Sequence, residues 1–317
     1  MTRVLITGGA GFLGSHVAAA LVARPDVELI VAGDVRRPEH PLDGVVYDEC
    51  DVTIAGALAP LLDRHGIDVV VHLAAIVNPG RDHDMEYRVD VEGSRHVLEA
   101  CLAAGVRRIV VSSSGAAYGY HPDNPEWLRE SDPVRGNDEF PYAKHKRLVE
   151  QMLAGYREAH PELEQVVFRI GTILGPTVDN QITALWNGAR LLAIRGSESP
   201  FVFVWVDDVA GAMARAATDG PPGVYNVAGD GRVTVHELAD RLGKPVFTVP
   251  AGVLAFALRI GRALRLTVHG PEQVGFLQYR PVLANDRLKS DFGYVPALSS
   301  AEAFEAYLDT HPGVALR

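Results

Sequence analysis

The N-terminal residues 4–14, with the sequence VLITGGAGFLG, constrain the fold more than any other part of the chain. A short β-branched strand over residues 4–7 leads directly into a glycine-rich turn, in which Gly8, Gly11 and Gly14 follow each other at intervals of three. Gly8 permits a tight turn, Gly11 lets a ligand approach the backbone, and Gly14 allows close packing of helix on strand. The positive end of the following helix attracts a pyrophosphate, so the segment predicts a dinucleotide site. The predicted cofactor residues of this turn are Gly8, Gly11, Phe12, Leu13 and Gly14.

An acidic residue, Asp34, follows the second predicted strand, 20 residues after Gly14. A carboxylate at this spacing accepts hydrogen bonds from both hydroxyls of an adenosine ribose and repels a 2′-phosphate, which favours NAD over NADP. Arg36 and Arg37 leave that preference open, because they are either solvated loop charges or ligands for such a phosphate. Asp51 and Val52 are expected to meet the adenine, and Leu73, Ala74 and Ala75 to lie beneath the cofactor. The other predicted cofactor contacts are Arg36, Ser112, Tyr142 and Lys146.

Short β-branched segments alternate with helix-length amphipathic segments through the first half of the chain. This pattern predicts an α/β fold of the Rossmann type, a doubly wound parallel sheet with helices on both faces. The alternation loosens after Gly171. We therefore expect a cofactor domain over residues 1–171, with a returning segment near 205–228, and a smaller C-terminal α/β substrate domain over 172–204 and 229–317. Strands are predicted at residues 4–7, 28–32, 45–47, 69–72, 108–112 and 165–169, and helices at 12–24, 54–65, 84–104 and 142–160.

Composition narrows the possible partners of the chain. Its 317 residues carry a net charge of −10 and no evident basic patch, which disfavours nucleic-acid binding. Cys50 and Cys101 are expected to be reduced and buried, and no metal site is expected from the histidine spacing. His83, His121 and His145 are interpreted as loop or surface residues. His236 is interpreted as part of a helix that begins after Thr234, not of a zinc motif.

The most apolar late segment, residues 253–266, contains Arg259, Arg262 and Arg265 at helical spacing and is too short to span a bilayer. It predicts a surface helix with one buried face, with membrane attachment as the lesser alternative. We expect no membrane partner. Met1 precedes the first strand without a charged leader, which favours a cytoplasmic protein.

Candidate catalytic groups come from two separate segments. Tyr142 and Lys146 are four residues apart in a predicted helix, so their side chains share one face. An ammonium favours the ionised form of a neighbouring phenol, which can take a proton from an alcohol as hydride leaves its carbon. Ser112, Ser113 and Ser114 close the fifth strand at its carboxyl end, where such sheets bind ligands. The alternatives are a surface Tyr–Lys contact and structural serines.

Over nearly its whole length the chain resembles the extended short-chain dehydrogenase/reductase family of NAD-dependent epimerase/dehydratase proteins. The resemblance implies that Ser114 is the catalytic serine, Tyr142 the base and Lys146 the lysine that holds the nicotinamide ribose. It also implies a homodimer formed through helices near 84–104 and 142–160, and a small-molecule substrate. Candidate substrate contacts are Ser114, Thr172, Asn180 and Phe201. The matching motifs are the glycine turn, Asp34, Asp51-Val52, Leu73-Ala74-Ala75, the serine run with Tyr118-Gly119, Tyr142 with Lys146, Gly175-Pro176, residues 206–210 and Tyr225-Asn226-Val227.

The chain also departs from the family pattern. Residues 115–117 are Gly-Ala-Ala, where dehydratases carry an acid. Thr172 replaces a sugar-nucleotide asparagine, and residues 201–203 are Phe-Val-Phe where many epimerases have a diphosphate-binding arginine. Either Arg195 or Arg280 supplies that charge, or the substrate is not a diphosphate. Asp90 stands where the family commonly has asparagine.

The sequence predicts an NAD-dependent enzyme that oxidises a secondary alcohol, with a sugar or nucleotide-sugar epimerase as the leading hypothesis. A first alternative is a net dehydrogenase or ketone reductase for a hydroxysteroid-like or other apolar substrate, suggested by Phe201, Val202 and Phe203. A second alternative is a non-catalytic dinucleotide sensor.

Overall fold

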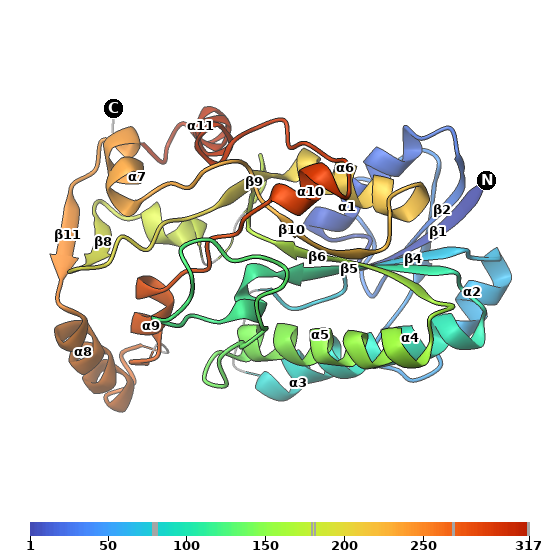
Figure 1. Cartoon of the computed structure of the whole chain (residues 1–317), viewed down its shortest axis with the longest axis horizontal. Helices are drawn as coiled ribbons and strands as arrows, with labels where there is room; N and C mark the ends of the chain where they lie inside the picture. The colour runs from blue at the N-terminus through green and yellow to red at the C-terminus, as the bar shows by residue number, and fades with distance from the viewer. Residues whose placement is uncertain (78–81, 179, 181, 268–269, 316–317) are drawn as a thin grey trace.

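The computed structural model describes residues 1–77, 82–178, 180, 182–267 and 270–315. At its centre lies a seven-stranded parallel sheet with the order β10-β6-β5-β4-β1-β2-β3 (Figure 1). The chain winds outward in both directions from β1, so the predicted doubly wound fold is confirmed. The order reverses between β1 and β4, and this switch point opens a crevice at the carboxyl ends of the strands. The strands are β1 (Thr2–Thr7), β2 (Val27–Asp34), β3 (Val45–Glu49), β4 (Val69–His72), β5 (Arg108–Ser114), β6 (Glu164–Ile170) and β10 (Gly223–Val227).

Alternate side chains of the central strand feed two hydrophobic cores. Val4 and Ile6 of β1 are fully buried against α1 and α6, whereas Leu5 is buried on the opposite face with α2, α4 and α5. Helices therefore cover both faces of the sheet, as Figure 1 shows. This is why strands buried on both sides consist almost wholly of apolar residues. These helices are α1 (Phe12–Val22), α2 (Ala59–His65), α3 (His83–Tyr87), α4 (Gly93–Ala103), α5 (Pro141–Ala159) and α6 (Val206–Thr218).

Two predicted helices differ from the structure. The helix predicted over 54–65 begins only at Ala59, because Gly56 adopts a φ of +79° that a helix does not allow. The helix predicted over 84–104 is divided into α3 and α4 by a π-helical turn, η1 (Arg88–Glu92). Such turns are rare and usually mark functional positions. The six predicted strands are all present, most of them one or two residues longer than expected.

A smaller region packs around its own aromatic core on one side of the sheet. Trp186, Phe203 and Phe304 are fully buried at its centre. Thr234 caps α7 with a capping box, so the predicted helix start after this residue is confirmed. The two-domain division stays a prediction. This region contains β7 (Thr172–Leu174), η3 (Thr183–Trp186), β8 (Leu191–Ile194), β9 (Phe203–Trp205), α7 (Val235–Leu242), β11 (Val246–Val249), α8 (Ala251–Ala263), α9 (Gln273–Gln278) and α11 (Ser300–Thr310). Between α9 and α11 the chain returns to the sheet, where α10 (Asp286–Ser290) buries Leu288 in the core shared with β10 and α6.

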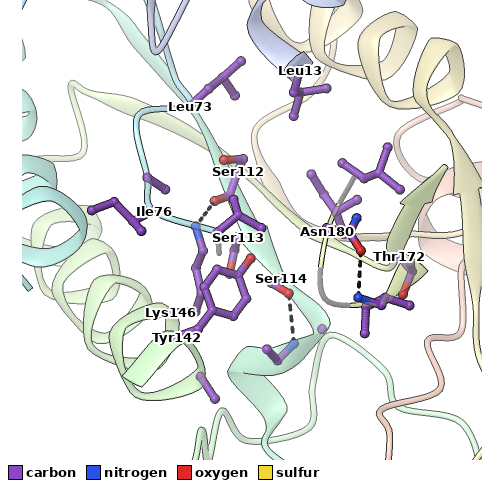
Figure 2. A pocket seen from close by; sticks show the side chains of 18 of the residues that line it. Leu13, Leu73, Ile76, Ser112, Ser113, Ser114, Tyr142, Lys146, Thr172 and Asn180 are labelled. Carbon is purple, nitrogen blue, oxygen red and sulfur yellow. Dashed lines mark hydrogen bonds between the residues drawn. The ribbon is translucent and has the colours of Figure 1, made fainter. Parts of the chain in front are cut away.

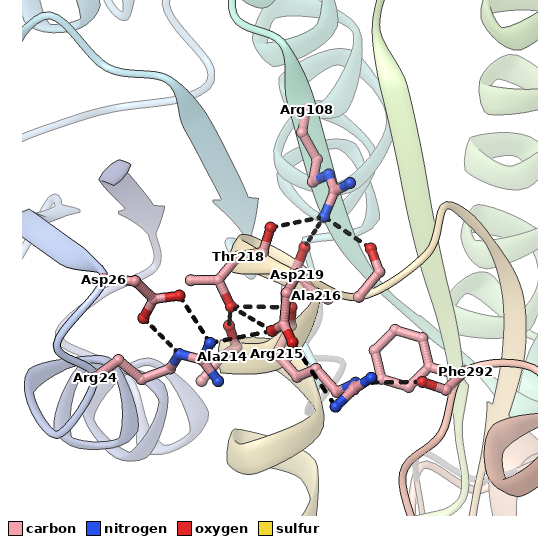
Figure 3. A network of polar contacts seen from close by, with 10 residues as sticks. Arg24, Asp26, Arg108, Ala214, Arg215, Ala216, Thr218, Asp219 and Phe292 are labelled. Atoms are coloured by element: carbon pink, nitrogen blue, oxygen red, sulfur yellow. Dashed lines mark hydrogen bonds and ion pairs between the residues drawn. The ribbon is translucent and has the colours of Figure 1, made fainter. Parts of the chain in front are cut away.

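A buried arginine joins the sheet to the end of α6 (Figure 3). Nη1 of Arg108 donates to the carbonyl oxygens of Ala216 and Gly220, both at 2.8 Å, and its Nε donates to Glu164 at 2.8 Å. The guanidinium thus satisfies carbonyls that the end of α6 leaves unpaired. At the surface nearby, Arg24 bridges Asp26 and Asp219.

The helix predicted over 253–266 is present as α8, but its predicted buried face is wrong. No residue of α8 is fully buried, because the helix lies at the edge of the molecule beside α9 (Figure 1). Within the described ranges, no helix combines the length and the hydropathy needed to cross a bilayer.

Candidate active site

The glycine turn forms a cradle in which side chains have no room. Gly8 has a φ of +71°, and a Cβ there would lie 2.8 Å from the backbone nitrogen of Ala74. A Cβ on Gly14 would collide with the carbonyl oxygen of Gly8. Gly11 is the N-cap of α1 and offers no side-chain acceptor, so the first N–H groups of the helix are available to a ligand. This cradle fits the pyrophosphate of a dinucleotide.

A single cavity of about 1300 Å³ extends from this turn to the end of β5 and into the smaller region. Every residue predicted to bind cofactor or substrate lines this cavity, although the residues come from segments far apart in the sequence. Their individual roles stay predictions. The cofactor set is Gly8, Gly11, Phe12, Leu13, Gly14, Asp34, Arg36, Asp51, Val52, Leu73, Ala74, Ala75, Ser112, Tyr142 and Lys146, and the substrate set is Ser114, Thr172, Asn180 and Phe201.

The carboxylate of Asp34 is held at the end of β2. It accepts hydrogen bonds from the backbone N–H groups of Ala10, at 3.1 Å, and Arg36, at 2.9 Å. The Arg36 side chain is 77% exposed, and its Nε lies 3.9 Å from the Asp34 carboxylate. The carboxylate is thus fixed beside the glycine turn, whereas the guanidinium extends into solvent.

The three candidate catalytic side chains meet in this cavity. Pro141 starts α5, where a missing N–H costs nothing, and this places Tyr142 in the first turn. Figure 2 shows Tyr142 and Lys146 side by side, with the phenol hydroxyl directed toward the end of β5. Lys146 donates to the carbonyl oxygen of Ser112 at 2.8 Å, and its ammonium lies 5.6 Å from the centre of the Tyr142 ring. Ser114 Oγ accepts from the backbone N–H of Ala116 at 3.1 Å.

Behind Lys146 lies a buried pair that no sequence motif indicates. His145 was expected at the surface, and that expectation is wrong: its side chain is only 6% exposed, and its Nδ1 lies 2.9 Å from Asp90 Oδ2. The other oxygen of Asp90 accepts from the backbone N–H of Ile76 at 2.8 Å. Both residues border a small second cavity with Lys146. Both oxygens of a carboxylate accept hydrogen bonds, so the second oxygen of Asp90 suits a donor N–H of His145. An asparagine at this position would present the N–H group of its amide to the histidine instead.

His72, at the end of β4, borders the same small cavity. Its two ring nitrogens lie 2.7 Å from Thr7 Oγ1 and 2.9 Å from Ser94 Oγ. Burial, together with the positive charge of Lys146, lowers the pKa of His72 to about 4. The imidazole is therefore neutral at physiological pH.

The side chain of Arg280 lies at the far end of the large cavity. Arg280 stacks on Phe201, with its guanidinium carbon 4.0 Å from the ring centre, and donates to the carbonyl oxygen of Ser199 at 2.6 Å. Its Nε is buried and has no hydrogen-bond partner among the described residues. Burial lowers the pKa of Arg280 to about 9, so the group remains protonated at neutral pH. Arg195, the alternative anion ligand, does not line the cavity.

Of the three residues that suggested an apolar substrate, Phe203 does not line the cavity but is buried in the aromatic core against Trp186. Asn180 lines the cavity, and its side-chain oxygen accepts from the N–H groups of Ile182 and Thr183. Thr172 lies at the start of β7 on the cavity wall.

Several lining residues carry no recognisable sequence signal. Tyr120 packs edge to face with Phe140 and with Phe276 at the substrate end, and Gln273 and Leu283 line the same cavity. They follow no motif spacing, and only the tertiary fold brings the segment near residue 276 to the segment near 120. The described residues include no cluster of His, Cys, Asp and Glu suited to a metal ion.

Cys50 and Cys101 are free and buried, which confirms the prediction for both. Burial raises the pKa of each thiol to about 12. Both sulfurs are therefore protonated near neutral pH, and neither is an activated nucleophile.

Comparison with known proteins gives a consistent result. The family model described as the NAD dependent epimerase/dehydratase family matches residues 4–228. The uncharacterized protein Rv0501 of Mycobacterium tuberculosis is 27% identical over 313 residues, covering 96% of this chain and 82% of that protein. UDP-glucose 4-epimerase of Erwinia amylovora is 30% identical over 196 residues, covering 58% of this chain and 57% of that enzyme.

Among solved structures, the UDP-glucose 4-epimerase of Thermus thermophilus in complex with NAD aligns with a TM-score of 0.76 and 26% identity, covering 98% of this chain and 99% of that one. The family match extends over more than half of the chain, and its first residues contain the glycine cradle. The chain is therefore an enzyme that uses NAD and belongs to the NAD-dependent epimerase/dehydratase family.

Proposed function

We propose that this enzyme oxidises a secondary alcohol of a sugar or nucleotide sugar by hydride transfer and acts as an epimerase. The observation that carries the proposal is the convergence of Tyr142, Lys146 and Ser114 on the cavity that also contains the glycine cradle. Three chemical groups from two distant segments are arranged for proton transfer beside a cofactor site. A non-catalytic dinucleotide sensor has no need of these three side chains. Membership in a family of enzymes also argues against the sensor alternative.

Each group has a distinct role in the proposed chemistry. NAD, when bound, accepts a hydride from the substrate carbon and returns it. Tyr142 takes the proton of the substrate hydroxyl as the hydride leaves and gives it back afterwards. Lys146 binds the ribose hydroxyls of the cofactor. Ser114 orients the reacting oxygen and stabilises its developing charge by hydrogen bonding.

The absence of an acidic side chain at residues 115–117 supports epimerisation over water elimination. Elimination needs a group that protonates the departing hydroxyl, and Gly115, Ala116 and Ala117 have none. All three residues are buried in η2 (Gly115–Tyr118), the turn that directly follows β5, so this stretch of the chain supplies no acid to the end of the strand.

Arg280 is our candidate for binding the diphosphate of a nucleotide sugar, because its buried Nε is an unsatisfied donor at the substrate end. Losing a charge-assisted hydrogen bond costs about 1.5–3 kcal/mol, so Arg280→Gln should raise the KM for a nucleotide sugar roughly 10–100-fold while NAD affinity is retained. Arg195→Gln, whose side chain is outside the cavity, is the matched control. Equal KM values for the two variants would argue against an anionic substrate.

A second candidate function is net oxidation or reduction of an apolar alcohol or ketone. Phe140, Phe201 and Phe276 at the substrate end favour this alternative. A substrate panel with NAD separates the two functions, since a net dehydrogenase accumulates NADH in proportion to product, whereas an epimerase converts its substrate without net NADH formation. Stoichiometric NADH from any substrate in the panel would replace the epimerase proposal.

Oligomeric state and location complete the proposal. We infer a homodimer that packs through the helices near 84–104 and 142–160, as the family resemblance implies, in the cytoplasm. Light scattering on the purified protein tests the dimer, and a monomer at micromolar concentration would contradict it.

A further inference from the structure

Helix α8 presents an apolar face to solvent. Val253, Phe256, Ile260 and Leu264 follow each other at spacings of three and four residues, and their exposed fractions are 57%, 64%, 43% and 63%. Such spacing places them on one side of the helix. Leu254, Ala255, Leu258 and Gly261, on the opposite side, are partly buried and face the protein. α8 therefore carries an exposed apolar stripe in addition to the apolar side that packs on the protein.

The exposed apolar stripe distinguishes α8 from an ordinary surface helix. A surface helix normally buries its apolar stripe and exposes its polar side. Together with Leu266, which is 78% exposed just after the helix, the outward side chains form an apolar patch on the order of a few hundred Å². The largest apolar patch on a typical soluble monomer is of this size and often has a binding role.

The charge of this segment differs from that of the rest of the molecule. Residues 251–267 contain Arg259, Arg262 and Arg265 and no acidic residue, in a chain whose net charge is −10. All three arginines are exposed. Arg262 donates to Glu272 at 2.9 Å at the base of the helix. An apolar stripe bordered by arginines is complementary to a surface that is apolar inside and negatively charged outside.

The helix also lies beside the mouth of the large cavity. Arg262 of α8 and Glu272, Gln273 and Phe276 of the following segment line that cavity. Figure 1 shows α8 at the outer edge of the smaller region, away from the seven-stranded sheet and from α4 and α5. A surface bound to α8 would thus lie next to the entrance of the substrate end and would leave the glycine cradle uncovered.

We propose that α8 binds the surface of an anionic lipid bilayer, with its exposed apolar stripe in the boundary between headgroups and acyl chains and with Arg259 and Arg265 at the lipid phosphates. A second copy of the chain fits less well. A symmetric contact would bring Arg259 and Arg265 of both copies into one interface, and neither copy supplies a carboxylate from residues 251–267. The proposal concerns a surface and does not depend on the identity of the substrate.

The test is flotation of the full-length protein with vesicles of phosphatidylcholine, either alone or mixed with phosphatidylglycerol. We expect binding to the mixed vesicles, at least tenfold weaker binding to phosphatidylcholine alone, and loss of binding at high salt. Phe256→Glu and Ile260→Glu, both at exposed positions outside the cavity, should each weaken binding to mixed vesicles at least tenfold. Val295→Glu changes an equally exposed apolar residue elsewhere and should bind as the wild type does.

NAD affinity, measured on each variant, verifies that the fold is retained and keeps this test separate from that of the epimerase. Equal flotation of Phe256→Glu and wild type would overturn the proposal, as would failure to bind either vesicle. Light scattering tests whether a second copy of the chain binds α8 instead. If the wild type is a dimer and Phe256→Glu is a monomer, the exposed face of α8 is a contact between copies, and this result would also overturn the lipid proposal.

Discussion

Tyr142 lies one turn before Lys146 on α5, and the Lys146 ammonium is 5.6 Å from the centre of its ring. Phenylalanine keeps the ring and removes only the hydroxyl. We therefore expect Tyr142→Phe to bind NAD with an affinity within about twofold of wild type in calorimetry, while turnover falls by roughly 10²–10⁴ because proton transfer loses its base. Tyr156→Phe, on the same helix, is the control and should turn over normally. A Tyr142→Phe enzyme with near-normal turnover would remove this phenol from the mechanism.

A second prediction at the scale of one residue concerns acid stability. Burial lowers the pKa of His72 to about 4, whereas a histidine in the unfolded chain titrates near 6.5. Between these values the unfolded chain binds a proton that the folded chain does not. The free energy of unfolding should therefore decrease as the pH falls through this window, by about 2–3 kcal/mol from this residue.

Urea unfolding at several pH values from about 7 down to about 4.5 measures the effect. His72→Gln retains a polar side chain between Thr7 and Ser94 but does not titrate, so its free energy of unfolding should vary less with pH than that of the wild type. Parallel curves for the two proteins would show that other groups cause the acid sensitivity.

At the scale of elements, Arg108 connects β5 to the end of α6 (Figure 3). Its side chain is 8% exposed and donates to the carbonyl oxygens of Ala216 and Gly220 as well as to Glu164. Arg108→Met leaves buried carbonyls unpaired, and we expect it to lower the free energy of unfolding by about 3 kcal/mol.

Arg24→Met provides the matched comparison. Arg24 bridges Asp26 and Asp219, but its side chain is 30% exposed and both carboxylates are more exposed still. Surface ion pairs contribute about 0–1 kcal/mol, so this variant should be nearly as stable as wild type in urea unfolding. A similar loss in both variants would mean that burial of Arg108 adds nothing.

Elements with a strong local pattern could be predicted from the sequence, and elements that depend on distant contacts could not. The β-branched strands and the glycine turn follow from residues within one short segment, and the structure confirms the strands. The division of the helix over 84–104 depends on Asp90, whose partners Ile76 and His145 come from other segments. The exposure of α8 likewise depends on how the rest of the chain packs around it.

At the scale of the whole molecule, the same limit applies to the candidate site. Residues near the glycine turn and in the Tyr142 helix follow spacing rules, and all of them line one cavity. No local sequence pattern distinguished Arg195 from Arg280 as the ligand of a diphosphate, because both lie in the irregular second half of the chain. Only the packing of the segment after α9 against Phe201 brings Arg280 into the cavity. Local spacing thus indicated which residues of the cofactor end share a cavity, whereas the position of Arg280 at the substrate end depends on tertiary packing.

The last prediction concerns how the cofactor stabilises the whole molecule. A ligand that binds only the folded chain stabilises it by about 2.7 kcal/mol at 100 times its Kd. The Asp34 carboxylate, which the N–H groups of Ala10 and Arg36 fix in place, should repel the 2′-phosphate of NADP. If this makes NADP roughly tenfold weaker, NAD at the same concentration should raise the Tm about 2–4 °C further than NADP does. Asp34→Asn should narrow that gap, and Glu49→Gln, at the exposed end of β3, should not. A larger Tm increase with NADP than with NAD would instead make Arg36 a ligand of the phosphate, with its guanidinium turned back from solvent toward the cavity.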